Sequence, residues 1–332
     1  MNLIRAQNQL DLVGKTPLLR IESLSHITGC EIFVKCEYMN PGGSVKDRAA
    51  KNMIDEALAS GALKPGMSII EGTAGNTGIG LAFIAKTRGI KATVVMPKGQ
   101  TIEKEKMVSL YGAELILVDA VPFANQNHFY HTARRMAEEE PSKYWWANQF
   151  ENLANFRAHY QETGPEIWQQ TDGKIDAFVS SAGTGGTLGG VSKFLKEKNA
   201  KIKTILVDPD GSGLYSYMKT GQFVSQGSSI TEGIGIMRLV ANFREAVLDD
   251  AYQIPDQELV TISRHVRDRD GLLLGSSSAL NLAAAYRLAK EMGPGKCIVT
   301  VACDLGERSA SKLYNDEFLA EKGLKVSGVS LV

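Results

Sequence analysis

The sequence lacks an excess of charge of either sign, and it has no long hydrophobic run. Lys+Arg and Asp+Glu both number 37 among 332 residues, so no net field attracts nucleic acid or an anionic membrane surface. No apolar stretch approaches membrane length, and the first residues hold no apolar core of signal-peptide length. The composition predicts a cytoplasmic protein that binds neither nucleic acid nor membrane.

Residue patterns that bind metals or form disulfides are also scarce. The five histidines form no HxxxH or HExxH pattern, and the four cysteines form no CxxC pair, so no metal site is expected. Three of the cysteines lie within or beside apolar, strand-like stretches, which predicts buried free thiols in a reducing compartment. The cysteines are Cys30, Cys36, Cys297 and Cys303.

What the sequence does contain is a regular alternation of apolar strands and helices. Expected strands in the first half are 67–72, 91–97 and 113–119, and expected helices are 44–61, 78–89 and 101–112. The second half repeats this order with strands at 176–183, 203–209 and 297–304 and a helix at 185–198. Strands without polar alternation, separated by helices, are typical of parallel sheets covered on both faces. The length suits two such domains, so the fold class is α/β.

Two glycine-rich loops each follow a strand and open a helix. They read "EGTAGNTGIG" (71–80) and "SAGTGGTLGG" (181–190). Helix N-termini at the carboxyl ends of parallel strands offer unpaired N–H groups, and glycines let these groups approach an anion. We therefore expect a phosphate site at 183–187 and a carboxylate site at 73–77. Tight strand-to-helix turns without a ligand are the alternative for either loop.

Lys46 lies in the first turn of the expected helix at 44–61, after the turn "NPGG". The helix dipole disfavours a cation at this position, so the free amine is favoured there, and a free amine is nucleophilic. A solvated surface lysine is the alternative. A dinucleotide-binding loop is disfavoured, because its GxGxxG pattern requires the third glycine one position before Gly189, after Gly183 and Gly185. Such a loop would also leave Lys46 without a role. A P-loop is excluded because neither loop is followed by GK[ST].

Seven segments in this order resemble the cysteine synthase/cystathionine β-synthase family. They are "NPGGSVKDR", "GTAGNTG", "NQFENLAN", "TGPEIW", "GTGGTLGG", "ITEGIG" and "GSSSAL", and the resemblance extends from residue 14 to residue 308. It implies a pyridoxal 5'-phosphate (PLP) enzyme of fold type II, which is similar to the tryptophan synthase β subunit. The domains implied are an N-terminal arm and strand on the larger domain (1–44), a smaller mobile domain (45–157) and the larger phosphate-binding domain (158–332).

The resemblance also implies roles for individual residues. Lys46 matches the lysine that binds the cofactor covalently, and Asn76 matches the asparagine that contacts the ring hydroxyl. The matches to the phosphate loop are Gly183, Thr184, Gly185, Gly186 and Thr187. The matches around the substrate carboxylate are Thr73, Ala74, Gly75, Asn76, Thr77 and Gln149. Gly233 and Gly235 match the glycines on the opposite side of the pocket.

Two positions depart from the pattern that we expect of cysteine synthases. Ala74 replaces a serine of the substrate loop, and "VACDLGER" has Asp304 and no serine where we expect a serine that contacts the pyridine nitrogen. We expect Asp304 to make that contact, with Cys303 or a water as the alternative. Both departures resemble the cysteine desulfhydrase branch of the family.

The implied reaction is β-elimination and β-replacement through an aminoacrylate, which converts O-acetylserine and sulfide to cysteine and acetate. The alternative is an L-cysteine desulfhydrase, which breaks cysteine down to sulfide, pyruvate and ammonia. A non-catalytic binding protein that keeps the PLP fold is a further alternative, although it would have no need of Lys46. The resemblance and the N-terminal arm together predict a homodimer.

Overall fold

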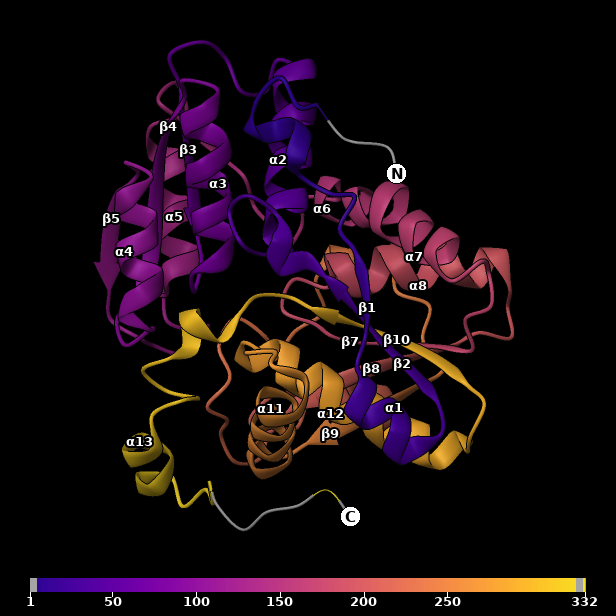
Figure 1. The fold of residues 1–332 in the computed structure, drawn as a ribbon. Coiled ribbons are helices and arrows are strands. Elements are labelled where there is room, and N and C mark those ends of the chain that lie inside the picture. The colour runs from indigo at the N-terminus through magenta and orange to yellow at the C-terminus, as the bar shows by residue number, and fades with distance from the viewer. Residues whose placement is uncertain (1–4, 327–330, 332) are drawn as a thin grey trace.

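The computed structural model describes residues 5–326 and 331, and its strands form two separate sheets (Figure 1). The larger sheet has the order β1 (Leu18–Arg20), β2 (Glu31–Cys36), β10 (Cys297–Ala302), β7 (Ala177–Ser181), β8 (Lys203–Pro209) and β9 (Asp250–Ile254). The smaller sheet has the order β5 (Glu114–Val118), β4 (Lys91–Pro97), β3 (Ser68–Gly72) and β6 (Tyr144–Trp146). All neighbouring pairs are parallel except β1 and β2. The predicted α/β class is confirmed.

Helices cover both faces of the larger sheet. The helices α1 (Glu22–Thr28), α11 (Asp256–Asp270) and α12 (Ser276–Met292) pack on one face. The helices α7 (Gly164–Gln170), α8 (Gly186–Lys198), α9 (Leu214–Thr220) and α10 (Ala241–Arg244) pack on the other. All five residues of β7 are buried, and so are the last six of β8. Burial on both sides explains why these strands show no polar alternation.

The smaller sheet is likewise enclosed by helices. The helices on one side are α2 (Lys46–Ala59), α3 (Asn76–Thr87) and α4 (Ile102–Leu110). Helix α5 (Phe129–Glu139) packs on the other side, against Ile70 and Val95. The remaining α-helices of the described residues are the short α6 (Ala154–Ala158) and α13 (Asp316–Glu321). No helix in the described part of the chain is long and apolar enough to cross a membrane.

The strands of the two sheets come from different parts of the chain. Strands β3 to β6 fall within 45–157, whereas β1 and β2 of the N-terminal segment join the larger sheet. The first four residues of the predicted arm lie outside the described residues, and the exact domain boundaries stay a prediction. The N-terminal and C-terminal parts of the chain are neighbours in the larger sheet, since β2 pairs with β10 over six residues.

Most predicted elements are present with shifted ends. The helix expected at 44–61 runs from Lys46 to Ala59. Ser44 precedes this helix and still accepts a hydrogen bond from its first turn, because Ser44 Oγ lies 3.2 Å from Lys46 N. The four cysteines are free, as predicted. Cys30 and Cys36 are buried, whereas Cys297 and Cys303 are partly accessible.

Candidate active site

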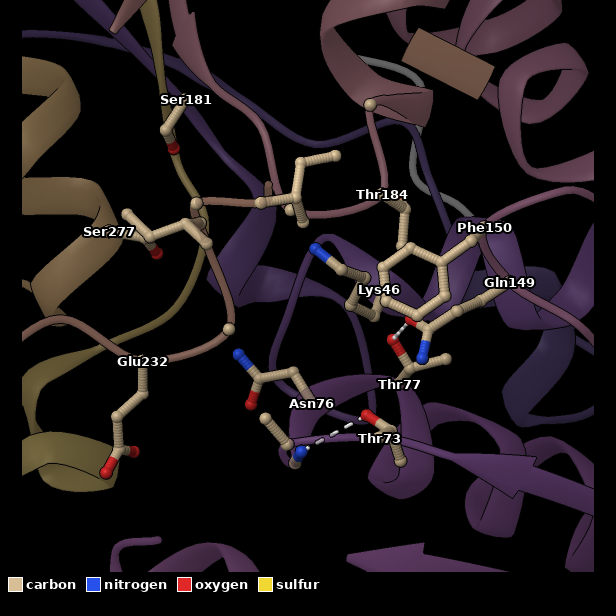
Figure 2. Close-up of a pocket in the computed structure, with 18 of the residues that line it drawn as sticks. Lys46, Thr73, Asn76, Thr77, Gln149, Phe150, Ser181, Thr184, Glu232 and Ser277 are labelled. Atoms are coloured by element: carbon tan, nitrogen blue, oxygen red, sulfur yellow. Dashed lines mark hydrogen bonds between the residues drawn. The ribbon is translucent and has the colours of Figure 1, made fainter. Parts of the chain in front are cut away.

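A cavity of about 380 Å³ opens where loops of the larger and smaller sheets meet. Its wall includes Lys46, residues 73–77 after β3, and parts of 183–187 after β7. The loop 232–238 and Gln149 complete the surroundings. Figure 2 shows side chains from these separate segments directed into one space. The two predicted anion loops and the lysine therefore belong to a single site.

Lys46 lines this cavity at the first residue of α2 (Figure 2). The preceding Val45 anchors the helix start to the larger sheet, because its N–H donates to the carbonyl of Cys303 at 2.9 Å. Among the described residues, Lys46 Nζ has no hydrogen-bond or ion-pair partner. A partly buried amine that faces a cavity without a carboxylate partner is suited to covalent chemistry. The solvated surface alternative for Lys46 is therefore wrong.

Residues 183–187 form the turn between β7 and α8, and the helix start has no side-chain cap. A Cβ on Gly183 would lie 2.2 Å from the carbonyl oxygen of Gly233, and one on Gly185 would lie 2.5 Å from the Cα of Phe243. Gly185 also has φ +84°, a conformation that favours glycine. The glycines therefore let this loop pack closely against residues 233 and 243, and the helix start that it forms fits a phosphate.

Two hydroxyls on this loop are held in place by buried neighbours. Thr184 Oγ1 accepts a hydrogen bond of 2.8 Å from Asn155 Nδ2, and Thr187 Oγ1 lies 3.2 Å from His159 Nε2. Burial lowers the pKa of His159 to about 3, so this imidazole is neutral. Gly186 does not line the cavity itself, but it begins α8, and a Cβ there would lie 2.1 Å from Asn155 Oδ1.

The second predicted anion loop, 73–77, leads from β3 into α3. Gly75 has φ +146° and precedes the first residue of α3, again without a side-chain cap. Thr73 Oγ1 accepts a hydrogen bond of 3.2 Å from Gly75 N, and Thr77 Oγ1 donates one of 2.5 Å to Gln149 Oε1, as Figure 2 shows. Ala74 lines the cavity with a methyl group. Backbone N–H groups at this helix start can bind a carboxylate.

Asp304, which we expected to contact the pyridine nitrogen, lies outside the cavity wall. Asp304 is only 3% exposed, and it is absent from the cavity wall. Its Oδ2 accepts a hydrogen bond of 2.7 Å from Asn76 Nδ2, which holds the carboxylate behind Asn76. Cys303 and Ser277 line the cavity instead. The arrangement therefore favours contact of Ser277 or Cys303 with a bound ring, while Asp304 contacts the site through Asn76.

Ser277 is a functional candidate that sequence reasoning missed. It lies in the first turn of α12, within the segment "GSSSAL" that we used only to establish the resemblance. The available signal was that Ser277 lies at a helix start after a glycine. The loops 73–77 and 183–187 of the same site also lead into helix N-termini. The predicted Gly233 and Gly235 do line the cavity, with φ +74° and +81°.

An ion pair across the two halves of the site was also missed. Lys104 of α4 and Glu232 both line the cavity, and their charged groups form a nearly buried salt bridge. Lys312 from the C-terminal part of the chain pairs with the other carboxylate oxygen of Glu232. Thr101 donates a hydrogen bond of 2.9 Å to the carbonyl of Arg308 nearby. These contacts close one side of the cavity between the smaller sheet and the larger sheet.

The fold and the site define a PLP-dependent enzyme of two α/β domains. Residues 10–304 match the pyridoxal-phosphate dependent enzyme family, and the chain belongs to this family. It is 46% identical to cysteine synthase 2 of Schizosaccharomyces pombe, over 94% of this chain and 85% of that protein. It is 44% identical to the cysteine synthase of Dictyostelium discoideum, over 97% and 87%.

Two further comparisons agree with this placement. Cystathionine beta-synthase of Rattus norvegicus is 38% identical over 96% of this chain, which spans 57% of that protein. The crystal structure of O-acetyl serine sulfhydrylase isoform 3 from Entamoeba histolytica superposes with a TM-score of 0.85 at 35% identity. That match covers 95% of this chain and 94% of the other. The predicted family, enzyme class and PLP cofactor are confirmed.

Proposed function

We propose that this protein is a cysteine synthase that converts O-acetylserine and sulfide to cysteine and acetate. The reaction breaks the bond between the β-carbon and the acetate oxygen and forms a bond between the β-carbon and sulfur. The observation that carries the proposal is the Lys46 amine, which has no partner among the described residues and lies in a cavity with two helix starts that lack a side-chain cap. The cysteine synthases among its relatives support the choice of substrates.

The residues of the phosphate loop would hold PLP at its phosphate, and Lys46 would hold it covalently. When bound, PLP supplies an electron-withdrawing ring next to the substrate α-carbon. Lys46 Nζ would accept the α-proton of the bound amino acid. Ser277 and Cys303 line the same cavity, and we assign the contact with the pyridine nitrogen to the Ser277 hydroxyl, the stronger hydrogen-bond donor.

The carboxylate of the substrate would bind at the start of α3. Thr73 and Thr77 line that part of the cavity, and the start of α3 has no side-chain cap. Asn76 faces the cavity from the same loop, with its amide held by Asp304 and Arg308. The ion pair of Lys104 and Glu232 shields one side of the bound substrate from water.

Breakdown of cysteine is a second candidate function. The observation in its favour is Ala74, which lines the cavity without the hydroxyl that would strengthen the hold on the substrate carboxylate. Weaker retention eases the release of an elimination product, which water converts to pyruvate and ammonia. Incubation with L-cysteine alone, with sulfide and pyruvate measured, tests this function. Absence of both products would leave cysteine synthesis as the single reaction.

The central experiment is Lys46→Ala, assayed with O-acetylserine and sulfide. The variant should lose cysteine formation and the visible absorbance of the covalently bound cofactor, because the other lysine in the cavity wall, Lys104, is held in an ion pair with Glu232. Lys51→Ala is the matched control, since Lys51 lies on the same helix and pairs with Asp55 at the surface. Wild-type activity in the Lys46→Ala variant would overturn the proposal.

The homodimer and the cytoplasmic location are part of the proposal. Free cysteines suit a reducing compartment, and Leu12 and Leu19 near the N-terminus are exposed apolar side chains that a partner subunit could cover. Sedimentation at micromolar concentration should give the mass of a dimer. A monomer under these conditions would contradict the dimer without affecting the proposed reaction.

A further inference from the structure

The cavity wall carries three basic side chains and, among the described residues, one acidic side chain. The basic residues are Lys46, Lys104 and Arg238, and the acidic residue is Glu232. We assigned Lys46 to the cofactor, and Lys104 is bound to Glu232 in an ion pair. Arg238, at the end of the loop 232–238, is therefore a charged group of the wall that the proposed function does not use.

Three aromatic rings hold the guanidinium of Arg238. Its central carbon lies 4.5 Å from the ring centre of Phe123, 4.8 Å from that of Tyr130 and 5.1 Å from that of Phe150. All three rings line the cavity with it. Cation–π contacts fix the position of a guanidinium and leave its charge in place. The neighbouring His128 adds no charge, because burial lowers the pKa of its imidazole to about 4.

Only part of this guanidinium is occupied by hydrogen bonds. Nη1 of Arg238 donates to Glu151 Oε1 at 2.8 Å, whereas Nε and Nη2 have no acceptor among the described residues and are not closed off from solvent. Glu151 does not line the cavity, and its side chain is 37% exposed. Water therefore screens this ion pair, and Arg238 keeps N–H groups that can donate to an anion in the cavity.

The proposed reaction brings an anion into this cavity. Hydrosulfide supplies the electron pair of the new bond between sulfur and the β-carbon, and acetate leaves with the pair of the broken bond. The two helix starts are assigned to the phosphate of the cofactor and the carboxylate of the substrate, and neither includes Arg238. Figure 2 shows the ring of Phe150, which contacts Arg238, directed into the same space as Lys46. The guanidinium therefore lies beside the space that Lys46 faces.

We propose that Arg238 binds the anionic nucleophile that replaces acetate on the β-carbon. This inference rests on the proposed function, which brings hydrosulfide into the cavity. Because Arg238 contacts the nucleophile directly, it selects among nucleophiles by charge. A small thiol that carries a carboxylate is therefore used in preference to a neutral thiol of similar size. Acetate has the same charge, so it occupies the same position and competes with the nucleophile.

Two thiols of similar size test this selection. Mercaptoacetate carries a carboxylate, whereas 2-mercaptoethanol is neutral, and each is assayed with O-acetylserine. We expect Arg238→Met to lower kcat/KM for mercaptoacetate about tenfold and for 2-mercaptoethanol less than about twofold, because it removes the charge and keeps an aliphatic stem against the rings. The value for sulfide should fall as well. An equal loss for both thiols would overturn the inference.

Arg244→Met is the matched control. Arg244 lies on α10, it is exposed and it does not line the cavity. Its replacement removes the same charge from the chain and should leave the ratio of the two thiols unchanged. An equal shift of this ratio in the control would assign the effect to net charge and overturn the inference.

The wild type gives a measurement that needs no variant. Raising NaCl from about 20 mM to about 500 mM should remove most of the preference for mercaptoacetate, because chloride screens and competes for the guanidinium. A wild type without this preference at low salt would contradict the role of Arg238.

Binding of acetate separates this inference from the proposed function. The holoenzyme is first saturated with L-alanine, so that the carboxylate position at the start of α3 is occupied. Acetate should then still bind, seen as broadening of its methyl NMR signal. Arg238→Met should abolish this broadening, with the Kd for L-alanine within about twofold of the wild type.

The possible failures then differ. A wild type that makes cysteine without binding acetate would overturn the inference alone. A wild type that binds acetate but makes no product from sulfide or either thiol would overturn the proposed function and leave the anion position at Arg238. A wild type that does neither would overturn both.

Discussion

The side-chain amide of Asn76 donates a hydrogen bond of 2.7 Å to the carboxylate of Asp304 and thereby joins the two halves of the molecule. Asn76 begins α3 beside the smaller sheet, whereas Asp304 follows β10 of the larger sheet. Arg308 holds the other end of the amide, because its Nη1 donates to Asn76 Oδ1 at 3.0 Å. Asn76 is therefore presented to the cavity in one orientation.

Asp304→Ala should weaken retention of PLP about tenfold, because Asn76 loses the acceptor that orients it. The measurement is titration of cofactor-free protein with PLP, followed by absorbance. Asp304→Asn is the matched variant, since its side-chain oxygen can still accept from Asn76 Nδ2, and it should retain most of the affinity. Wild-type affinity in the alanine variant would contradict a positioning role for Asp304.

Gly185→Asp should abolish retention of PLP. The new side chain would meet Phe243, it would strain a backbone at φ +84°, and its charge would repel the phosphate. Gly221→Asp is the control for backbone strain, because Gly221 has φ +77° and no atom within 4 Å of an added Cβ. Circular dichroism should show both variants folded. Bound cofactor in folded Gly185→Asp would remove the assignment of this loop to the phosphate.

The free energy of unfolding should fall as the pH rises from about 4 to 7, in part because of Asp47. Its Oδ2 accepts from Gly42 N at 2.6 Å, its Oδ1 has no partner among the described residues, and burial raises the pKa of Asp47 to about 7. An unfolded aspartate titrates near pH ~4, so over this interval the folded protein binds the extra proton. The contribution is at most about 1.4 kcal/mol per pH unit.

Asp47→Asn cannot titrate and should show a shallower decline of the unfolding free energy between pH 5 and 7. Denaturant unfolding at several pH values measures this slope. The exposed Asp119→Asn serves as control and should follow the wild type. Parallel curves for the wild type and Asp47→Asn would contradict the assignment.

Arg48→Met should destabilise the fold by about 3–5 kcal/mol, because it leaves buried Glu37 without its cation. Arg48 Nε donates to Glu37 Oε2 at 2.8 Å, and both side chains are 0% exposed. Arg48 also binds Glu166 at 2.7 Å. Urea unfolding measures the loss. The control is Lys98→Met, which removes the exposed pair with Asp119 and should change the free energy of unfolding little. An equally small effect of Arg48→Met would mean that the buried pair contributes no net stability.

Much of the active site was predictable because its signals are local. A glycine loop between an apolar strand and a helix is written in consecutive residues, so the sequence located 73–77 and 183–187, most of which line the cavity, while their ligands stay a prediction. Lys46 was recognisable by its place in a helix start. In each case the backbone conformation that forms the site depends on residues within one turn of it.

The sequence by itself determined the α/β class, the family and the loops that line the cavity. The tertiary structure decided which distant residues meet there: Ser277 in place of Asp304, the pairing of Lys104 with Glu232, and Arg238 beside Phe150. The pairing of β2 with β10 and the packing of α12 bring residues more than 200 positions apart into one site. No local propensity encodes such contacts, because they depend on how apolar faces pack across the whole chain.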